Sequence, residues 1–211
     1  MHILLAAATT FEIQPTIGGG WSQVLITGVG GVATTWSLMR QIGIHRPDLI
    51  VQAGIGGCFT DAKPGTVFAI REDELADLGV WENESFRTLS DLGLADVNRL
   101  PNPYHDLLAF TGLPEASALT INEITTDPRR ISWYRQNRDA VVESMEGGPL
   151  HYVCLRENIP FLQLRSISNA VGVRDKTKWD IRLAITRLNE QLTRILHRLS
   201  SADPSLLTPL K

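Results

Sequence analysis

Short apolar runs alternate with longer amphipathic segments along most of this chain, and that alternation restricts the folds open to it. The strand-sized runs are residues 3–8, 23–27, 49–53, 66–70, 117–121 and 161–167. Helical patterns occupy residues 31–42, 149–157 and 181–199, and in the last of them apolar side chains recur every three or four positions. Because most runs are apolar enough to be buried on both faces, they predict a central mixed, mostly parallel sheet between helices. The expected fold is α/β, a single-domain three-layer αβα sandwich.

Length and composition restrict the organisation and the partners. A chain of 211 residues with 43% apolar content and 20% charge suits one soluble domain. We assign that domain to residues 1–200 and expect a flexible tail at residues 201–211, where the periodicity is lost. The net charge is −3 and no cluster of Lys and Arg occurs, so the sequence favours a small-molecule ligand over nucleic acid.

The cysteines and the first residues concern the cellular setting. Cys58 and Cys154 are far apart and belong to no Cys or His cluster, so neither a disulfide framework nor a metal site is expected. The apolar opening MHILLAAA is too short to span a membrane and lacks the features of a signal peptide. The sequence therefore predicts a cytoplasmic protein with no membrane partner, no metal and no cofactor.

Two glycine clusters follow predicted strands, at the strand ends where α/β proteins bind ligands. They comprise Gly28, Gly30 and Gly31 in ITGVGGVATT, and Gly54, Gly56 and Gly57 in LIVQAGIGGCF. Each cluster is expected to form a turn in which bare backbone comes close to a ligand. The first cluster is similar to a dinucleotide fingerprint, but its glycine spacing differs and no acidic residue follows the next strand at the required distance. An ordinary tight turn is the competing interpretation.

Three further positions near strand ends carry side chains that suit a nucleoside. In VVESMEGGPLHYV, the carboxylate of Glu146 could accept hydrogen bonds from a diol and the thioether of Met145 could pack on a sugar. The alternative is a helix cap beside a core methionine. In LRSISNAVGVRD, the amide of Asn169 follows Ser168 and could both donate to and accept from a heterocycle, or it could simply form a turn. Glu12 stands just past the first strand, where a glutamate is usually exposed.

In order and spacing, these positions resemble the nucleosidase branch of the purine nucleoside phosphorylase superfamily. The resemblance rests on Glu12 and on the stretches TGVGGVAT, AGIGG, SMEG and SISN, and it is weakest over residues 71–114. Asn169 in place of an aspartate, Gly54 in place of a serine, and the stretch SISNAVGVRDKTKW are similar to the members that hydrolyse futalosine for menaquinone synthesis. The resemblance implies a nucleoside phosphorylase-like fold and a homodimer or larger homo-oligomer.

The resemblance also implies roles for individual residues. Glu12 would orient and deprotonate the attacking water, Glu146 would bind the ribose hydroxyls, and Met145 would pack under the sugar. Asn169 would meet the purine, and because its NH2 group suits a carbonyl at C6, hypoxanthine is expected as the base. The remaining substrate-binding candidates are Gly30, Gly54, Gly56, Ser168, Arg174 and Asp175.

Some of these assignments have alternatives. Arg174 could hold the carboxylate on the aromatic ring of futalosine, and Asp175 could protonate the leaving base or pair with Arg174. The chain has ATTFE where the phosphorylases carry an arginine and a Gly-Asp-Pro motif, and a carboxylate there would repel phosphate, so hydrolysis is favoured over phosphorolysis. An aminofutalosine, methylthioadenosine or S-adenosylhomocysteine nucleosidase, a phosphorylase, and a non-catalytic nucleotide-binding or redox domain are the competing interpretations.

Overall fold

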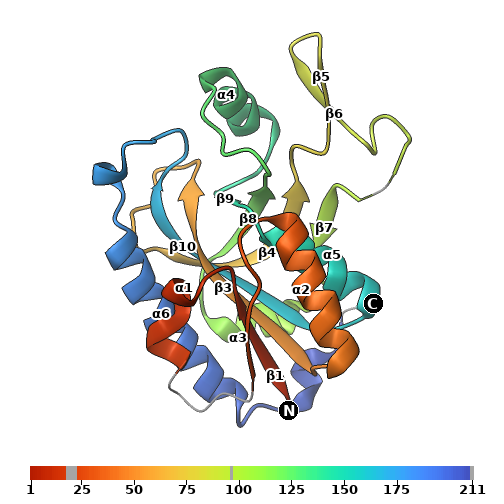
Figure 1. Cartoon of the computed structure of the whole chain (residues 1–211), viewed down its shortest axis with the longest axis vertical. Coiled ribbons are helices and arrows are strands. Elements are labelled where there is room, and N and C mark those ends of the chain that lie inside the picture. The colour runs from red at the N-terminus through yellow and green to blue at the C-terminus, as the bar shows by residue number, and fades with distance from the viewer. Residues whose placement is uncertain (18–22, 96, 210–211) are drawn as a thin grey trace.

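The computed structural model describes residues 1–17, 23–95 and 97–209 (Figure 1). The main sheet contains β1 (Ile3–Ala7), β2 (Gln23–Ile26), β3 (Leu49–Cys58), β4 (Val67–Leu75), β7 (Arg99–Pro101), β8 (Glu115–Thr120), β9 (Val142–Ser144) and β10 (Phe161–Ala170). A separate hairpin joins β5 (Gly79–Glu82) to β6 (Ser85–Thr88). The helices are α1 (Thr10–Ile17), α2 (Gly31–Ile44), α3 (His105–Thr111), α4 (Pro128–Asn137), α5 (Gly147–Glu157) and α6 (Ile181–Leu199), with 3-10 turns η1 (Lys176–Lys178) and η2 (Pro204–Leu207).

The long strand β3 has different neighbours at its two ends. On one edge it pairs in parallel with β10 from Ile50 to Cys58. On its other edge it pairs in parallel with β1 at residues 49–52 and antiparallel with β9 at residues 57–58. Because β10 also pairs with β4, β4 with β8, and β8 with β9, these five strands close into a ring, and β1 and β2 extend the sheet beside it. The sequence predicted the mixed sheet but not this closure.

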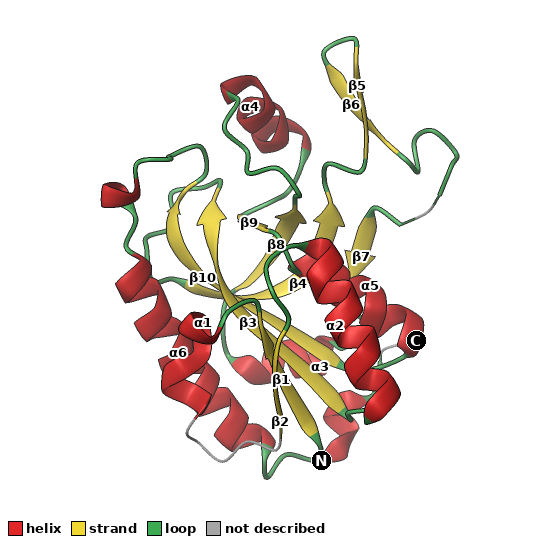
Figure 2. Cartoon of the chain, in the orientation of Figure 1, coloured by secondary structure: helices red, strands yellow, loops and turns green. Residues whose placement is uncertain are grey.

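Helices cover both faces of the sheet (Figure 2). On one face α6 packs on β3, β4 and β10 and is joined by α1, and on the other α5 packs on β4, β8 and β10 beside α2. The predicted apolar face of α6 is confirmed, because its buried residues include Leu188, Leu192 and Ile195 at helical spacing. A second apolar cluster, filled from every strand of the ring, contains Cys58, Ile70, Ala116, Ala118, Val142 and Ile167. The predicted three-layer α/β fold is therefore confirmed.

Two glycine-containing stretches that we expected to be turns are strands. Gly54, Gly56 and Gly57 all lie inside β3, and Asn169 lies inside β10 instead of leaving the sheet after Ser168. The two strands pair over this whole stretch, which keeps both chains extended. A Cβ atom on Gly56 would lie 2.8 Å from the carbonyl oxygen of Glu143 in β9. Glycine is therefore used here for close strand packing, whereas the turn at Gly28 and Gly30 is confirmed, with φ of +85° and +90°.

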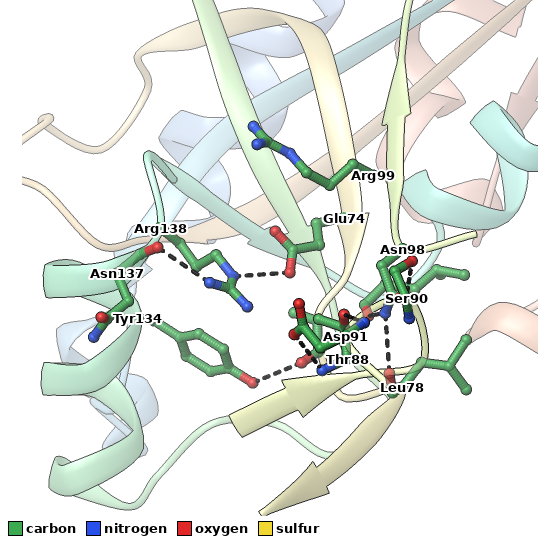
Figure 3. Close-up of polar contacts among 12 residues, drawn as sticks. Glu74, Leu78, Thr88, Ser90, Asp91, Asn98, Arg99, Tyr134, Asn137 and Arg138 are labelled. Atoms are coloured by element: carbon green, nitrogen blue, oxygen red, sulfur yellow. Dashed lines mark hydrogen bonds and ion pairs between the residues drawn. The ribbon is translucent and has the colours of Figure 1, made fainter. Parts of the chain in front are cut away.

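The region after β4, where the sequence pattern is least informative, forms the β5–β6 hairpin, and the loop between β8 and β9 contains α4. Figure 3 shows the polar contacts at their base. Arg138, which follows α4, donates from Nε to Glu74 Oε1 at 2.8 Å, and Asn98 donates from Nδ2 to the carbonyl oxygen of Leu78 at 3.0 Å. The hydroxyl of Tyr134 donates to the carbonyl oxygen of Ala76 at 3.3 Å. These contacts fix α4 and the hairpin beyond the carboxyl ends of β8 and β4, which they follow in the chain.

The residues after α6 and the prediction that the chain has no membrane-spanning segment can be compared with the structure. In the predicted tail, residues 204–207 form η2, and Leu207 packs against the main core, whereas residues 210 and 211 lie outside the described part of the chain. The domain limits stay a prediction. Within the described residues, every helix is either too short or too polar to cross a membrane.

Candidate active site

Glu146 connects the glycine turn before α2 to the start of α5. The backbone N–H of Gly30 donates a hydrogen bond to Glu146 Oε1 at 3.1 Å. Glu146 occupies the capping position of α5, but its side chain makes no capping hydrogen bond to that helix. The interpretation in which Glu146 merely caps a helix is therefore wrong, because its carboxylate faces the turn before α2. The buried carboxylate is held between two chain segments that come from opposite halves of the sequence.

Arg165, in the middle of β10, is the main residue of this site that the sequence analysis did not select. Its side chain is fully buried, with Nη1 3.4 Å from Glu146 Oε2. Its Nη2 donates to Gln52 Oε1 at 2.8 Å, and Gln52 donates in turn from Nε2 to the carbonyl oxygen of Glu146 at 3.3 Å. A buried guanidinium persists only when its charge and donors find such partners. The available signal was an arginine inside an otherwise apolar strand.

Glu12 lies in the first turn of α1 and is also buried. Its Oε1 accepts the N–H of Ile55 at 3.1 Å, and its Oε2 accepts the N–H of Thr9 at 3.0 Å. The N–H of Ile55 is available because β1 stops pairing with β3 at Gln52, before β9 begins to pair with it. Asn189 of α6 donates to the carbonyl oxygen of Glu12 at 2.8 Å and fixes the backbone there. Glu12 thus fills the gap that the two neighbours of β3 leave open.

Gly54 lies beside Glu12 and Arg165, and its missing side chain leaves room for both of them. A Cβ atom at Gly54 would lie 2.3 Å from Arg165 Nη1 and 3.0 Å from Glu12 Oε1. Burial raises the pKa of Glu12, the Arg165 guanidinium lowers it, and the Glu146 carboxylate raises it. The structure therefore brings Glu12 and Glu146 together around one buried arginine.

Asn169 lies farther along the same pair of strands. It pairs in register with Gly57, and a Cβ atom on that glycine would lie 3.6 Å from Asn169 Nδ2. The Ser168 hydroxyl donates to the carbonyl oxygen of Gly56 at 3.2 Å and to Asn169 Oδ1 at 2.7 Å, which fixes the amide orientation. Gly54 and Gly57 are three residues apart in a strand, or about 10 Å, so a nucleoside could reach from the acids to the amide.

The remaining candidates fall in two places. Met145 and Gly30 line a cavity of about 530 Å³ beside the start of α2, together with Asn122. Arg174 and Asp175 lie in the exposed segment after β10, where the Arg174 guanidinium stacks over the Trp179 ring at 5.6 Å. Hydrogen bonds from the Thr177 side chain and backbone lower the pKa of Asp175. Their described contacts lie within that segment, away from the two acids.

A further buried carboxyl group lies behind Glu146. Asp73 Oδ1 accepts a hydrogen bond from the Thr120 hydroxyl at 2.8 Å, and that hydroxyl accepts the N–H of Gly148 in the first turn of α5 at 2.7 Å. Burial raises the pKa of Asp73 to about 6, against the effects of Thr120, a neighbouring glutamine and Arg165. The group supports the start of α5, which carries Glu146. Among the described residues, no set of three or more His, Cys, Asp and Glu side chains is placed to hold a metal ion.

Comparisons with known proteins show which family the chain belongs to. Residues 9–201 match the model of the phosphorylase superfamily. The chain is 31% identical over 194 residues to the futalosine hydrolase of Streptomyces coelicolor, covering 88% of this chain and 82% of the relative. It is 27% identical over 179 residues to the futalosine hydrolase of Thermus thermophilus, covering 82% of this chain and 80% of that one.

Solved structures show the same fold. The 5'-methylthioadenosine/S-adenosylhomocysteine nucleosidase of Helicobacter pylori superposes with a TM-score of 0.77 at 16% identity, over 93% of this chain and 97% of that one. The native futalosine hydrolase of the same organism superposes with a TM-score of 0.74 at 15% identity, again over 93% and 97% of the two chains. The chain therefore belongs to the phosphorylase superfamily. Within that superfamily it is a member of the futalosine hydrolase family, as its sequence resemblance predicted.

Proposed function

We propose that this chain hydrolyses the N-glycosidic bond of futalosine, releasing hypoxanthine and dehypoxanthine futalosine. The observation that carries the proposal is the 31% identity to a futalosine hydrolase over most of both chains. The Glu12, Arg165 and Glu146 arrangement supports it independently, because a nucleosidase must stabilise a ribosyl cation and position a water molecule.

Glu12 and Glu146 have different roles in the reaction at the sugar. A water molecule that attacks the anomeric carbon must lose a proton, and a buried carboxylate with a raised pKa, such as Glu12, is a suitable acceptor. Glu146 accepts hydrogen bonds from the ribose hydroxyls, and its negative charge favours the cation. In this low-dielectric site the two carboxylates would otherwise repel each other. The positive charge of Arg165 offsets that repulsion, because it pairs with Glu146 and lowers the pKa of Glu12. Hydrolysis is favoured over phosphorolysis because phosphate would meet the same negative charges.

Asn169 supports hypoxanthine as the leaving base. The Ser168 hydroxyl donates to Asn169 Oδ1, and one N–H of the amide donates to the carbonyl oxygen of Ala170. The second N–H can donate to the carbonyl at C6 of hypoxanthine. An exocyclic amine at the same place, as in adenine, would meet another donor. The base is therefore recognised by the Asn169 amide, which cannot itself donate a proton to the leaving base.

The cellular role and the assembly follow from the same family. We place the reaction in menaquinone synthesis in the cytoplasm and expect a homo-oligomer. Val29, Val32 and Trp36 form an exposed apolar stripe at the start of α2, where they are 59%, 86% and 62% exposed. The stripe adjoins the cavity that Met145 lines. A second copy of the chain seated there would remove this apolar surface from water and cover the sugar.

The test is incubation of the purified protein with futalosine in phosphate-free buffer, with chromatographic detection of hypoxanthine. Glu12→Gln and Glu146→Gln should each lose at least about 100-fold in kcat, because each removes a charge that the reaction needs. Glu157→Gln, at the partly exposed last residue of α5, is the matched control. Inosine, aminofutalosine and methylthioadenosine, each with and without phosphate, separate the proposal from its alternatives. Base release only in the presence of phosphate, or turnover of methylthioadenosine in preference to futalosine, would contradict it.

A further inference from the structure

Glu143 stands in a row with Asn169 across three neighbouring strands. Asn169 in β10 pairs with Gly57 in β3, and Gly57 pairs with Glu143 in β9. Directly paired residues point to the same face of a sheet. The neighbouring residue Val142 belongs to the cluster inside the ring, so Glu143 must point to the outer face. A carboxyl group and a carboxamide thus flank a glycine on one face, two strand spacings or about 10 Å apart.

The middle of this row has no side chain. Gly57 is partly exposed, although it lies between two paired strands. A Cβ atom there would lie 3.0 Å from Val171 and 3.6 Å from Asn169 Nδ2, so any larger residue would take up the space between the amide and the acid. Met145, the residue we assign to the sugar, packs against an apolar cluster that contains Leu119, the partner of Glu143 in β8. A base attached to that sugar is then directed along this face towards the row.

The chemical state of Glu143 suits a proton donor. The side chain is only 7% exposed, and its Oε2 is buried without a hydrogen-bond partner. Burial raises the pKa of Glu143 to about 7, hydrogen bonds from Thr125 lower it, and the Asp77 carboxylate raises it. At neutral pH a large fraction of the group is therefore the neutral acid, with one oxygen uncommitted.

Among the described residues, the groups that act on the pKa of Glu143 are Thr125 and the Asp77 carboxylate, and neither is a cation that would keep it ionised. The charged and titratable groups acting on it or near it are Asp77 after β4 and Tyr134 on α4. The nearby cations are engaged elsewhere: Arg130 pairs with Glu123 at 3.2 Å, and Arg135 donates to the carbonyl oxygen of Phe59 at 2.9 Å.

The reaction needs such a donor, and the other candidates do not provide it. When the bond from the anomeric carbon to N9 breaks, its electron pair stays on the base, and hypoxanthine leaves far more readily if a ring nitrogen gains a proton. The Asn169 amide cannot give one up, and its Nδ2 already donates to the carbonyl oxygen of Ala170 at 2.9 Å. Asp175 is exposed with a lowered pKa, so it is almost fully ionised at neutral pH.

We propose that Glu143 is the catalytic acid of this site and protonates a ring nitrogen of the leaving purine. The inference rests on the proposed function, because it requires a purine nucleoside as substrate. The carboxyl proton of Glu143 passes to the base as the glycosidic bond breaks, and the hydroxyl of water bonds to the anomeric carbon. The other proton of that water passes to Glu12. Glu143 leaves the step as a carboxylate and Glu12 as a carboxylic acid, and exchange with solvent restores both.

The test compares wild type, Glu143→Gln, Glu143→Asp and the control Glu115→Gln, an exposed carboxyl at the first residue of β8. For each, kcat on futalosine is measured from pH 5 to 9 and thermal stability is measured in parallel. Wild type should lose kcat as pH rises through about 7, where Glu143 ionises. Glu143→Gln should lower kcat by about 100- to 10,000-fold and abolish that alkaline decline, since it has no proton to give. Glu143→Asp should keep the decline at reduced kcat, and Glu115→Gln should match wild type.

A second substrate separates catalysis from structure. The nitrophenolate of p-nitrophenyl β-D-ribofuranoside leaves as a stable anion, so its release should be equal in wild type and Glu143→Gln. The inference would be overturned if Glu143→Gln kept its kcat on futalosine within about threefold, kept the alkaline decline, or lost both substrates to the same degree. If wild type fails to cleave futalosine, the proposed function fails, and the same comparison on the purine nucleoside that it cleaves fastest decides the role of Glu143.

Discussion

The buried carboxyl group of Asp73 gives a quantitative prediction about stability and pH. Asp73 has no exposed surface, and burial raises its pKa from the ordinary value of 3.8 to about 6. A group whose pKa is raised by folding stabilises the fold below its unfolded pKa, and this contribution is lost as pH rises through the folded pKa. The interval from 3.8 to about 6 corresponds to about 3 kcal/mol lost across that range.

Asp73→Asn removes the titration and keeps the shape. Its carbonyl oxygen can still accept from the Thr120 hydroxyl, so any loss of packing should be equal at every pH. Relative to wild type, the variant should therefore gain roughly 2.5 kcal/mol in free energy of unfolding between pH 4 and pH 8. Urea denaturation at the two pH values, at one protein concentration, measures this difference. Asp106→Asn, at an exposed position of α3, is the control and should show little change.

The opposite result would be informative. If wild type and Asp73→Asn lose or gain stability in parallel from pH 4 to pH 8, then Asp73 keeps an ordinary pKa in the folded protein. Its charge would then be matched by Arg165 more closely than the burial suggests, and the account of the group behind Glu146 would be wrong.

Three further predictions concern specificity, assembly and backbone geometry. Asn169→Asp should move the ratio of kcat/KM towards adenine nucleosides in a side-by-side assay, because a carboxylate accepts from the exocyclic amine. Trp36→Asp should shift the oligomer towards monomer in size-exclusion chromatography, whereas Ile44→Asp, 71% exposed on the same helix, should not. Gly172→Ala should lower the melting temperature more than Gly93→Ala: both have positive φ, which costs about 1 kcal/mol, but a Cβ on Gly172 would also lie 2.6 Å from Ile131.

The sequence predicted the elements that a simple pattern specifies. The amphipathic face of α6, the glycine turn before α2 and the junction that carries Met145 and Glu146 are each encoded in contiguous residues, so all three were predicted. The three-residue β9 was indicated only as the strand end before Met145 and Glu146, because so few residues carry no period.

Other features depend on partners distant in the chain. The local pattern around Gly54, Gly56 and Gly57 predicts a turn, and only the pairing with β10 shows that these residues belong to a strand. Arg165 could be chosen only once Gln52 and Glu146 were known to surround it, and Glu143 once β9 was known to pair with β3. The roles of these residues depend on strand pairing, which a local sequence pattern does not show.

The closed ring also has a consequence for biosynthesis. β10 is the last strand to be made, yet it joins β3 to β4, strands completed about a hundred residues earlier. Until β10 leaves the ribosome, one long edge of β3 has no neighbour, and an open edge invites pairing with other chains. The amino-terminal half therefore cannot complete its sheet until β10 has been made. A chain terminated before β10 should be rescued by chaperones or degraded, and should not accumulate as a folded fragment.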